Sequence, residues 1–134
     1  MPFTHRLRVR YNECDPQNVV FNANFLAYTD IAITELLRDA FGSYTQMVQT
    51  HGVDQVVGEA RIRYRAPARF DDVVDITLTM THLGTTSTTT RFEMACEGTL
   101  LAEGELRHVF VDPAGLGKTP IPDAVREALS AYGP

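Results

Sequence analysis

The chain has 134 residues, of which 44% are apolar and 22% charged, so it is long and apolar enough for one domain spanning residues 1–134. Its formal net charge is −5. That charge argues against nonspecific binding to DNA or to anionic membranes, because both need a basic surface. A polyanionic ligand would likewise need basic residues gathered at its own site.

The two cysteines, Cys14 and Cys96, belong to no CxxC pair and to no His/Cys cluster with zinc spacing. We therefore expect no disulfide framework and no metal site. The chain does not open with the basic and then apolar stretch that is typical of a signal peptide. It also has no run of about 18 apolar residues that would span a bilayer. These features favour a reduced protein located in the cytoplasm.

The first segment alternates Leu7, Val9 and Tyr11 with arginines, which predicts a half-buried strand. A polar, turn-rich stretch follows over residues 12–18. From about residue 22 to residue 41, apolar side chains then recur with helical spacing, which predicts a long and largely buried helix.

The apolar face of this helix consists of two neighbouring stripes: Phe25, Tyr28, Ala32 and Leu36, and Leu26, Ile33, Leu37 and Ala40. We expect Asn22 or Asn24 to cap its start, since a side-chain oxygen there accepts from a free backbone N–H. Gly42 stands where a helix usually ends.

After a loop around His51 and Gly52, four stretches with a period of two predict four strands with one wet face each. They cover about residues 58–65, 74–81, 91–97 and 102–110, and a short helix is predicted from Asp123 to Ala131. Short connections after residue 70 favour a meander. The fold class is therefore α+β, with a five-stranded antiparallel sheet wrapped around the one long apolar helix.

Asp15 is the strongest catalytic candidate by position. It precedes Pro16 in the loop before the buried helix, where free N–H groups and the positive end of the helix dipole gather. A carbonyl bound there would be polarised, and a carboxylate beside it would act on water or attack the carbonyl directly. The structural alternative is that Asp15 only starts an Asx-turn before Pro16.

Residues Arg10 to Phe25 read RYNECDPQNVVFNANF. This segment resembles the signature of the 4-hydroxybenzoyl-CoA thioesterase family: a strand, an Asp, two residues, a Gly, one residue, a Val and an aromatic-rich helix start. Three later segments are similar to the family in the same order. Tyr64–Asp72 resembles its Y-x-x-P-x-x-x-x-D turn, residues 98–112 its final strand, and residues 120–122 its closing x-I-P.

The resemblance implies the hotdog fold and an acyl-CoA thioesterase, which hydrolyses a thioester to a free acid and CoA-SH. Asp15 matches the essential carboxylate, as general base or nucleophile. The backbone N–H of Asn22 or Ala23 matches the donor to the thioester carbonyl oxygen. No cofactor is implied, because coenzyme A is part of the substrate, and an acyl-carrier-protein thioester stays open as the alternative.

Family members form homodimers with a continuous sheet, often paired into homotetramers, and their acyl pocket lies at the dimer interface. The resemblance therefore implies a homodimer or homotetramer, while nothing predicts a nucleic-acid or membrane partner. The residues that we expect at the substrate are Asn18, Val19, Phe21, Asn24, Phe25, Val57, Glu59, Arg61 and His82. Some of the apolar ones are equally suited to the core.

Two departures from the family pattern matter. Asn18 stands at the family's glycine, and we expect it in a left-handed conformation, because Asn is the residue that best replaces Gly there. One family member carries a basic cluster for the coenzyme A phosphates in the turn that corresponds to residues 83–87. This turn has no positive charge here, and His82 is the nearest candidate.

Other candidates have a structural and a functional interpretation. One face of the second predicted strand carries Glu59, Arg61, Arg63 and Arg65. The functional interpretation is a patch that binds the coenzyme A phosphates, and the simpler one is a solvated face that also protects a sheet edge. Glu35 on the long helix is a second candidate for the catalytic acid. Its structural alternative is an ordinary exposed charge on the helix surface. His108 falls on the apolar side of its strand, which is typical of a core histidine.

Two other functions remain compatible with the sequence. A hotdog dehydratase or hydratase typically uses a His with an Asp or Glu, and its His-type motif is absent here. A non-catalytic acyl-CoA-binding hotdog protein would fit the missing basic turn and the Asn18 substitution.

Overall fold

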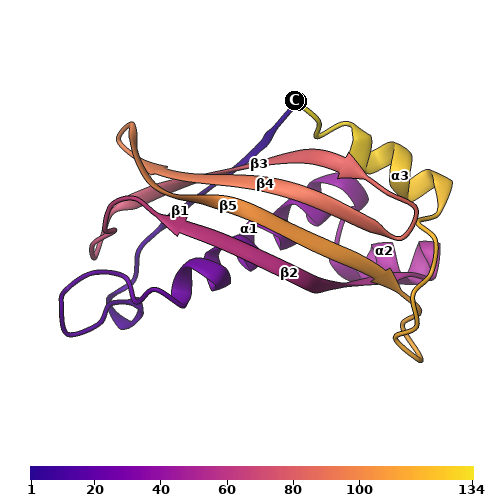
Figure 1. The fold of residues 1–134 in the computed structure, drawn as a ribbon, viewed down its shortest axis with the longest axis horizontal. Helices are drawn as coiled ribbons and strands as arrows, with labels where there is room; N and C mark the ends of the chain where they lie inside the picture. Colours follow the sequence, from indigo (N-terminus) through magenta and orange to yellow (C-terminus); the bar gives the residue numbers. More distant parts are fainter.

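A computed structural model describes residues 1–134. Three helices and five strands make up the fold, with one 3-10 turn (Figure 1). In chain order they are β1 (Phe3–Arg8), the 3-10 turn η1 (Tyr11–Glu13), α1 (Asn24–Phe41), α2 (Tyr44–His51), β2 (Asp54–Tyr64), β3 (Val73–Leu83), β4 (Ser87–Cys96), β5 (Thr99–Val111) and α3 (Asp123–Ser130).

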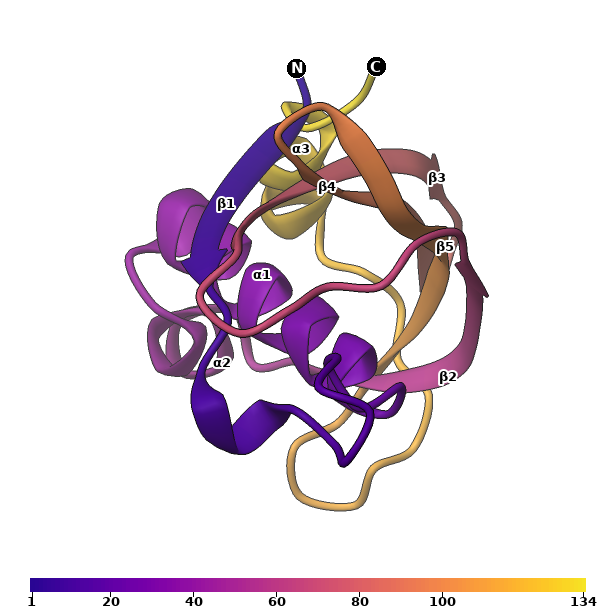
Figure 2. The same cartoon turned by 90° about the vertical axis from the view of Figure 1, so that its left-hand side faces the viewer.

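The five strands form one antiparallel sheet in the order β1-β3-β4-β5-β2. The predicted meander is confirmed for β3, β4 and β5, which pair in succession. β1 and β2 are consecutive strands in the sequence, but they lie at opposite edges of the sheet. The chain crosses from one edge to the other through α1 and α2. Figure 2 shows the sheet curving around α1, as the sequence predicted.

The first predicted stripe of α1 is confirmed as core, since Phe25, Tyr28, Ala32 and Leu36 are all buried. Each such large apolar side chain contributes about 1.5–3 kcal/mol through removal from water. Ile33 and Leu37 of the second stripe are buried too, but Leu26 is 43% exposed. Within one chain, therefore, the side of α1 that faces β2 is incompletely covered.

α2 was not predicted from the sequence, where a loop was expected around His51 and Gly52. The side-chain oxygen of Ser43 accepts from Gln46 N at 2.9 Å and starts α2, and Gly52 ends it with a φ of 68°. Met47 is its one fully buried residue, which is why its apolar pattern was too weak to read. The predicted end of α1 at Gly42 is confirmed, with a φ of 89°.

The first strand ends earlier than predicted. β1 stops at Arg8, Val9 lies buried just beyond it, and Tyr11 is 81% exposed in η1. The predicted alternation holds in β3, β4 and β5, where the predicted inward residues are buried except for Cys96 and Gly104, which are partly exposed. The C-terminal helix is confirmed as α3, which buries Val125 and Leu129. None of the helices has both the length and the hydropathy that crossing a membrane requires.

β2 departs most from its prediction, because it has no buried face. Val57 is 53% and Tyr64 50% exposed. A bulge between Val57 and Glu59 interrupts the alternation, so Val57 pairs with His108 while Glu59 pairs with Arg107. β2 lies at the edge of the sheet, and its exposed apolar residues are left without cover.

Candidate active site

Asp15 lies in a small hairpin between η1 and α1. The segment that joins these two elements is the indigo loop at the lower left of Figure 1. The N–H of Asp15 donates to Val19 O at 2.9 Å, and Cys14 pairs with Val20 as an isolated bridge. The N–H of Val20 donates to Ala68 O at 2.7 Å, which fastens the hairpin to the segment before β3. The hairpin therefore holds Asp15 at a fixed place near the start of α1.

Asn18 forms the turn of this hairpin. Its φ is 62°, so the predicted left-handed conformation is confirmed. Its N–H donates to Asp15 O at 2.9 Å and closes the turn. A residue with a larger or branched side chain is strained at such a φ, whereas Asn and Gly tolerate it. The loop therefore keeps its shape although the glycine of the resembled signature is replaced.

The carboxylate of Asp15 is half-buried and has one oxygen occupied. Oδ1 accepts from Gln17 N at 2.8 Å, which is the Asx-turn that the structural alternative predicted. Oδ2 accepts no hydrogen bond from the chain. The turn thus orients the side chain, and one oxygen stays available to a water molecule or an acyl carbon.

The start of α1 presents two unused backbone donors. The N–H groups of Asn24, Phe25 and Leu26 donate to the carbonyls three residues earlier, at 2.8, 3.2 and 3.2 Å. The N–H groups of Asn22 and Ala23 donate to nothing in the chain, and both residues are exposed. They lie at the positive end of the helix dipole, where a carbonyl oxygen or an oxyanion is stabilised.

The predicted asparagine cap is wrong. Ala23 occupies the cap position of α1, and no side chain accepts a hydrogen bond there. The Asn24 side chain instead donates to Glu13 O at 2.8 Å, and the Asn22 carbonyl accepts from the Tyr64 hydroxyl at 3.0 Å. The Asn24 side chain is therefore engaged with the segment before the hairpin, and the Asn22 side chain makes no hydrogen bond to the helix start, so the first N–H groups stay open.

A sequence model of the thioesterase-like superfamily matches residues 9–129, nearly the whole chain. The chain belongs to this superfamily. It is 34% identical over 124 residues to the acyl-CoA thioester hydrolase YbgC of Escherichia coli, with 92% of both chains covered.

Solved structures of similar proteins have the same fold as this chain. The chain superposes on a hypothetical protein from Thermus thermophilus with a TM-score of 0.88 and 32% identity, over 100% of this chain and 99% of that one. A thioesterase-superfamily structure from Jannaschia sp. gives a TM-score of 0.91 at 21% identity, covering 98% and 93%, and supports the fold alone. The expected hotdog fold is confirmed.

In this thioesterase-like chain, aromatic side chains surround the helix start. Phe25 is buried and contacts the ring of Tyr64, with centroids 5.5 Å apart, while Phe21 is partly exposed and Val19 half-buried. Tyr64 was not among the site residues predicted from the sequence. Its place at the first position of the Y-x-x-P turn was the one available signal.

Val57 is not part of this aromatic cluster. It lines a trough, which is an open groove between α1 and β2. The trough has a volume of about 260 Å³, and its apolar walls are Leu26, Ile33, Val57, Ala60 and Leu106. Thr29, Asp30 and His108 complete the lining. Because Leu26 lies in the first turn of α1, the trough begins close to the free N–H groups of Asn22 and Ala23.

Glu35 is not brought to the site. It forms an ion pair with Arg38 at 3.1 Å on the side of α1. Eleven residues separate it from Asn24, which is about 16 Å along a helix. This placement matches the ordinary helix charge that was the structural alternative.

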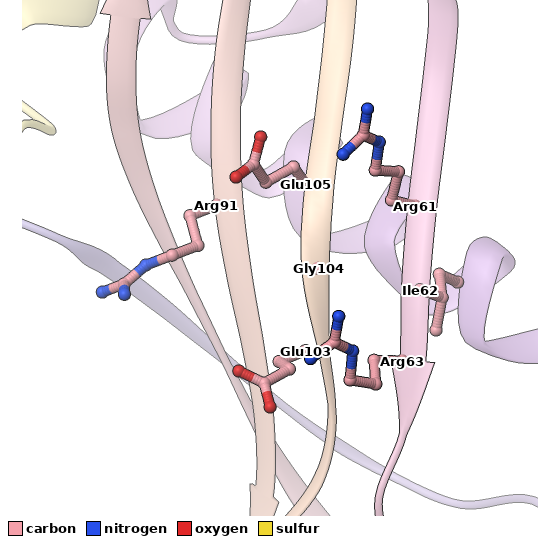
Figure 3. Close-up of a pocket in the computed structure, with 7 residues that line it drawn as sticks. All are labelled: Arg61, Ile62, Arg63, Arg91, Glu103, Gly104 and Glu105. Atoms are coloured by element: carbon pink, nitrogen blue, oxygen red, sulfur yellow. The ribbon is translucent and has the colours of Figure 1, made fainter.

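Arg61 lies on the outer face of the sheet, on the far side of β2 from α1 (Figure 3), and Glu59 lies two residues before it on β2. They pair with each other at 3.0 Å. Arg61 and Arg63 lie in register with Glu105 and Glu103 of β5, and the shallow pocket between them has a volume of about 300 Å³. Acidic neighbours offset much of the positive charge, and the sheet separates this face from Asp15.

His82 is exposed near the end of β3, opposite Thr89 of β4. The Asp15 hairpin is fastened to Ala68, before β3 begins at Val73, and Val73 is nine residues or about 30 Å along the strand from His82. His82 and Asp15 of one chain therefore do not meet.

Proposed function

We propose that the protein is an acyl-CoA thioester hydrolase in which Asp15 is the catalytic carboxylate. One observation carries the proposal: the hairpin that leaves Asp15 Oδ2 free leads directly into the turn with the free N–H groups of Asn22 and Ala23. A base and a pair of oxyanion donors on one short segment are the groups that acyl transfer to water requires.

In the general-base route, Asp15 Oδ2 takes a proton from water as the water oxygen attacks the thioester carbon. The carbonyl oxygen becomes an oxyanion that accepts from the N–H groups of Asn22 and Ala23. Collapse of this tetrahedral species breaks the C–S bond, and the proton passes to the leaving thiolate. The products are the free acid and CoA-SH. In the nucleophilic route, Asp15 Oδ2 attacks the thioester carbon and expels the CoA thiolate, which takes a proton from water; the mixed anhydride that remains is then hydrolysed by water to the free acid and the Asp15 carboxylate.

The test is thiol release from a panel of acyl-CoAs by wild type and Asp15→Asn. Asp112→Asn is a matched control, because Asp112 also precedes a proline and also accepts from the N–H two residues on, with Ala114 N at 2.9 Å. We expect Asp15→Asn to lower kcat by roughly 10²–10⁴-fold and the control to leave it unchanged. Equal turnover by both variants would remove Asp15 from the mechanism.

We also propose that two copies join along β2 into a homodimer. β2 is an edge strand of 11 residues, and Val56, Val57 and Tyr64 on it are exposed apolar side chains. A long edge of this kind pairs with another strand unless something covers it. Such pairing would close the open side of the trough at Val57, and we propose that the trough then takes the acyl group.

We place the protein in the cytoplasm, where reducing conditions suit free cysteines. Cys14 and Cys96 are both free thiols. We propose coenzyme A as the carrier of the acyl group, with acyl-carrier protein as the alternative that the substrate panel should include.

A further inference from the structure

Glu13, two residues before Asp15, receives four hydrogen bonds. Its side-chain Oε1 accepts from Tyr28 Oη at 2.8 Å and from Arg10 N at 2.7 Å. Its backbone oxygen accepts from Phe21 N at 2.9 Å and from Asn24 Nδ2 at 2.8 Å. One residue thus links the segment after β1 that leads into the Asp15 hairpin, the segment that leaves the hairpin, and the first two turns of α1.

Two of the partners of Glu13, Tyr28 and Asn24, lie on α1. Tyr28 is 1% exposed and packs against Phe25, with ring centroids 5.9 Å apart. Asn24 lies one turn before it on α1, so the two donors point from the same side of the helix. Burial, and next the hydrogen bond to Glu13, raise the pKa of Tyr28 well above its ordinary value, so the hydroxyl stays a neutral donor at any physiological pH.

The position of these contacts matters for the site. Phe21, whose N–H donates to the Glu13 carbonyl, comes directly before Asn22, and Glu13 itself comes two residues before Asp15. Movement of Glu13 against α1 would therefore change the separation of the carboxylate from the free N–H groups of Asn22 and Ala23. A misplacement of about 1 Å between reacting groups can cost about 10²-fold in rate.

We propose that Glu13 is a positioning residue, which through Tyr28 and Asn24 fixes Asp15 relative to the N–H groups of Asn22 and Ala23. This inference rests on the proposed function. It assigns to Glu13 no proton transfer and no contact with substrate, although Glu13 is the carboxylate nearest to Asp15 in the sequence.

Tyr28→Phe removes the donor and keeps the buried ring. Tyr132→Phe is its matched control, because the hydroxyl of Tyr132 donates to another carboxylate, Asp39 Oδ2 at 2.7 Å, away from the hairpin. We expect Tyr28→Phe to lower kcat by about tenfold with KM changed less than about threefold, and Tyr132→Phe to leave both unchanged. A purely structural role would lower the thermal stability of both variants and the kcat of neither, which would overturn the proposal.

Glu13→Gln and Glu13→Ala separate positioning from acid–base chemistry. Glutamine keeps a side-chain oxygen that accepts from Tyr28 and Arg10 N, so it should restore most of the kcat that alanine loses, with the pH profile unchanged in shape. If glutamine instead lost as much as alanine and removed a limb of the pH profile, Glu13 would be a catalytic residue and the proposal would be wrong.

A measurement without substrate keeps this inference apart from the proposed function. The amide proton of Phe21 donates to Glu13 O, and its exchange with solvent can be followed by NMR. We expect it to exchange faster in Tyr28→Phe than in wild type and Tyr132→Phe. A wild type that releases no thiol from any acyl-CoA would end the proposed function alone, whereas unchanged Phe21 exchange in Tyr28→Phe would overturn the positioning role.

Discussion

The hydroxyl of Tyr64 donates to the carbonyl oxygen of Asn22 at 3.0 Å, across 42 residues of sequence. That carbonyl belongs to the same planar peptide unit as the N–H of Ala23. The hydrogen bond therefore fixes the direction in which the Ala23 N–H points. It also ties the edge strand β2 to the start of α1, so the proposed oxyanion donors depend on a residue of the sheet.

Tyr64→Phe should weaken catalysis more than stability. The ring would still pack against Phe25, and a hydrogen bond from a half-exposed side chain contributes only about 1 kcal/mol to folding. We expect kcat/KM to fall by about 3- to 10-fold, because the Ala23 N–H is no longer aligned with the transition state. Steady-state kinetics and a urea titration measure the two effects. Tyr44→Phe, which removes a hydroxyl bound to Asp54, is the control and should leave kcat/KM unchanged.

Asn18 provides a test of the backbone of the Asp15 turn. With a φ of 62°, Asn18→Ala should destabilise the protein by about 1–2 kcal/mol, the usual cost of a left-handed residue that has a Cβ and no local hydrogen-bonding side chain. Asn18→Gly should be close to wild type in both stability and kcat. Urea unfolding midpoints check the prediction, and an alanine variant as stable as the glycine variant would contradict it.

The strand periodicity and the apolar stripe of α1 are strong local signals, and they predicted an antiparallel sheet around one long helix; the resemblance to a thioesterase family then implied the hotdog fold. The left-handed Asn18 was also predictable, since few residues tolerate that conformation. The exposed face of β2 was not, because alternation reports which side chains share a face and not whether anything covers it. Tyr64 was missed for a similar reason: its partner Asn22 is 42 residues away, and its distance to the helix start depends on the whole sheet.

His108 gives an expected dependence of stability on pH. Burial lowers its pKa below the unfolded value of about 6.5, and the charge of Asp30 only partly opposes this shift. As the pH falls below about 6.5, the unfolded chain binds the proton first, so stability decreases. One such proton changes the free energy of unfolding by at most about 1.4 kcal/mol per pH unit. Urea titrations between about pH 6.5 and 5.5 should show a smaller loss in His108→Asn than in wild type or in His82→Asn, whose histidine is exposed.

The proposed dimer can be tested at Val57. Val57→Lys puts a charge on the exposed face of β2, beside the trough. We expect it to shift the sedimentation coefficient from dimer to monomer and to reduce thiol release by at least about tenfold, because desolvating a charge at an apolar contact is costly. Leu116→Lys, in the loop after β5, is an equally exposed control. A Val57→Lys variant that stays dimeric would place the interface elsewhere.

Gly104 tests the packing that holds β2 against β5. A Cβ on this residue would clash with the backbone oxygen of Arg61 and would lie 2.8 Å from the ring of Phe92. The first of these is backbone of the paired strand, so it yields only if β2 and β5 separate locally. Overpacking of this kind usually costs about 1–3 kcal/mol and more where backbone must move.

We therefore expect Gly104→Ala to destabilise the protein by at least about 3 kcal/mol, or to leave it insoluble. Gly115→Ala adds the same methyl group in the loop after β5, where nothing lies within 4 Å, and should be neutral. Because β2 carries Tyr64, a soluble Gly104→Ala variant should also lose activity, through the loosened hydrogen bond to Asn22. Thermal unfolding of both variants gives the difference directly, and equal melting temperatures would show that the close pairing of β2 with β5 at Arg61 is wrong.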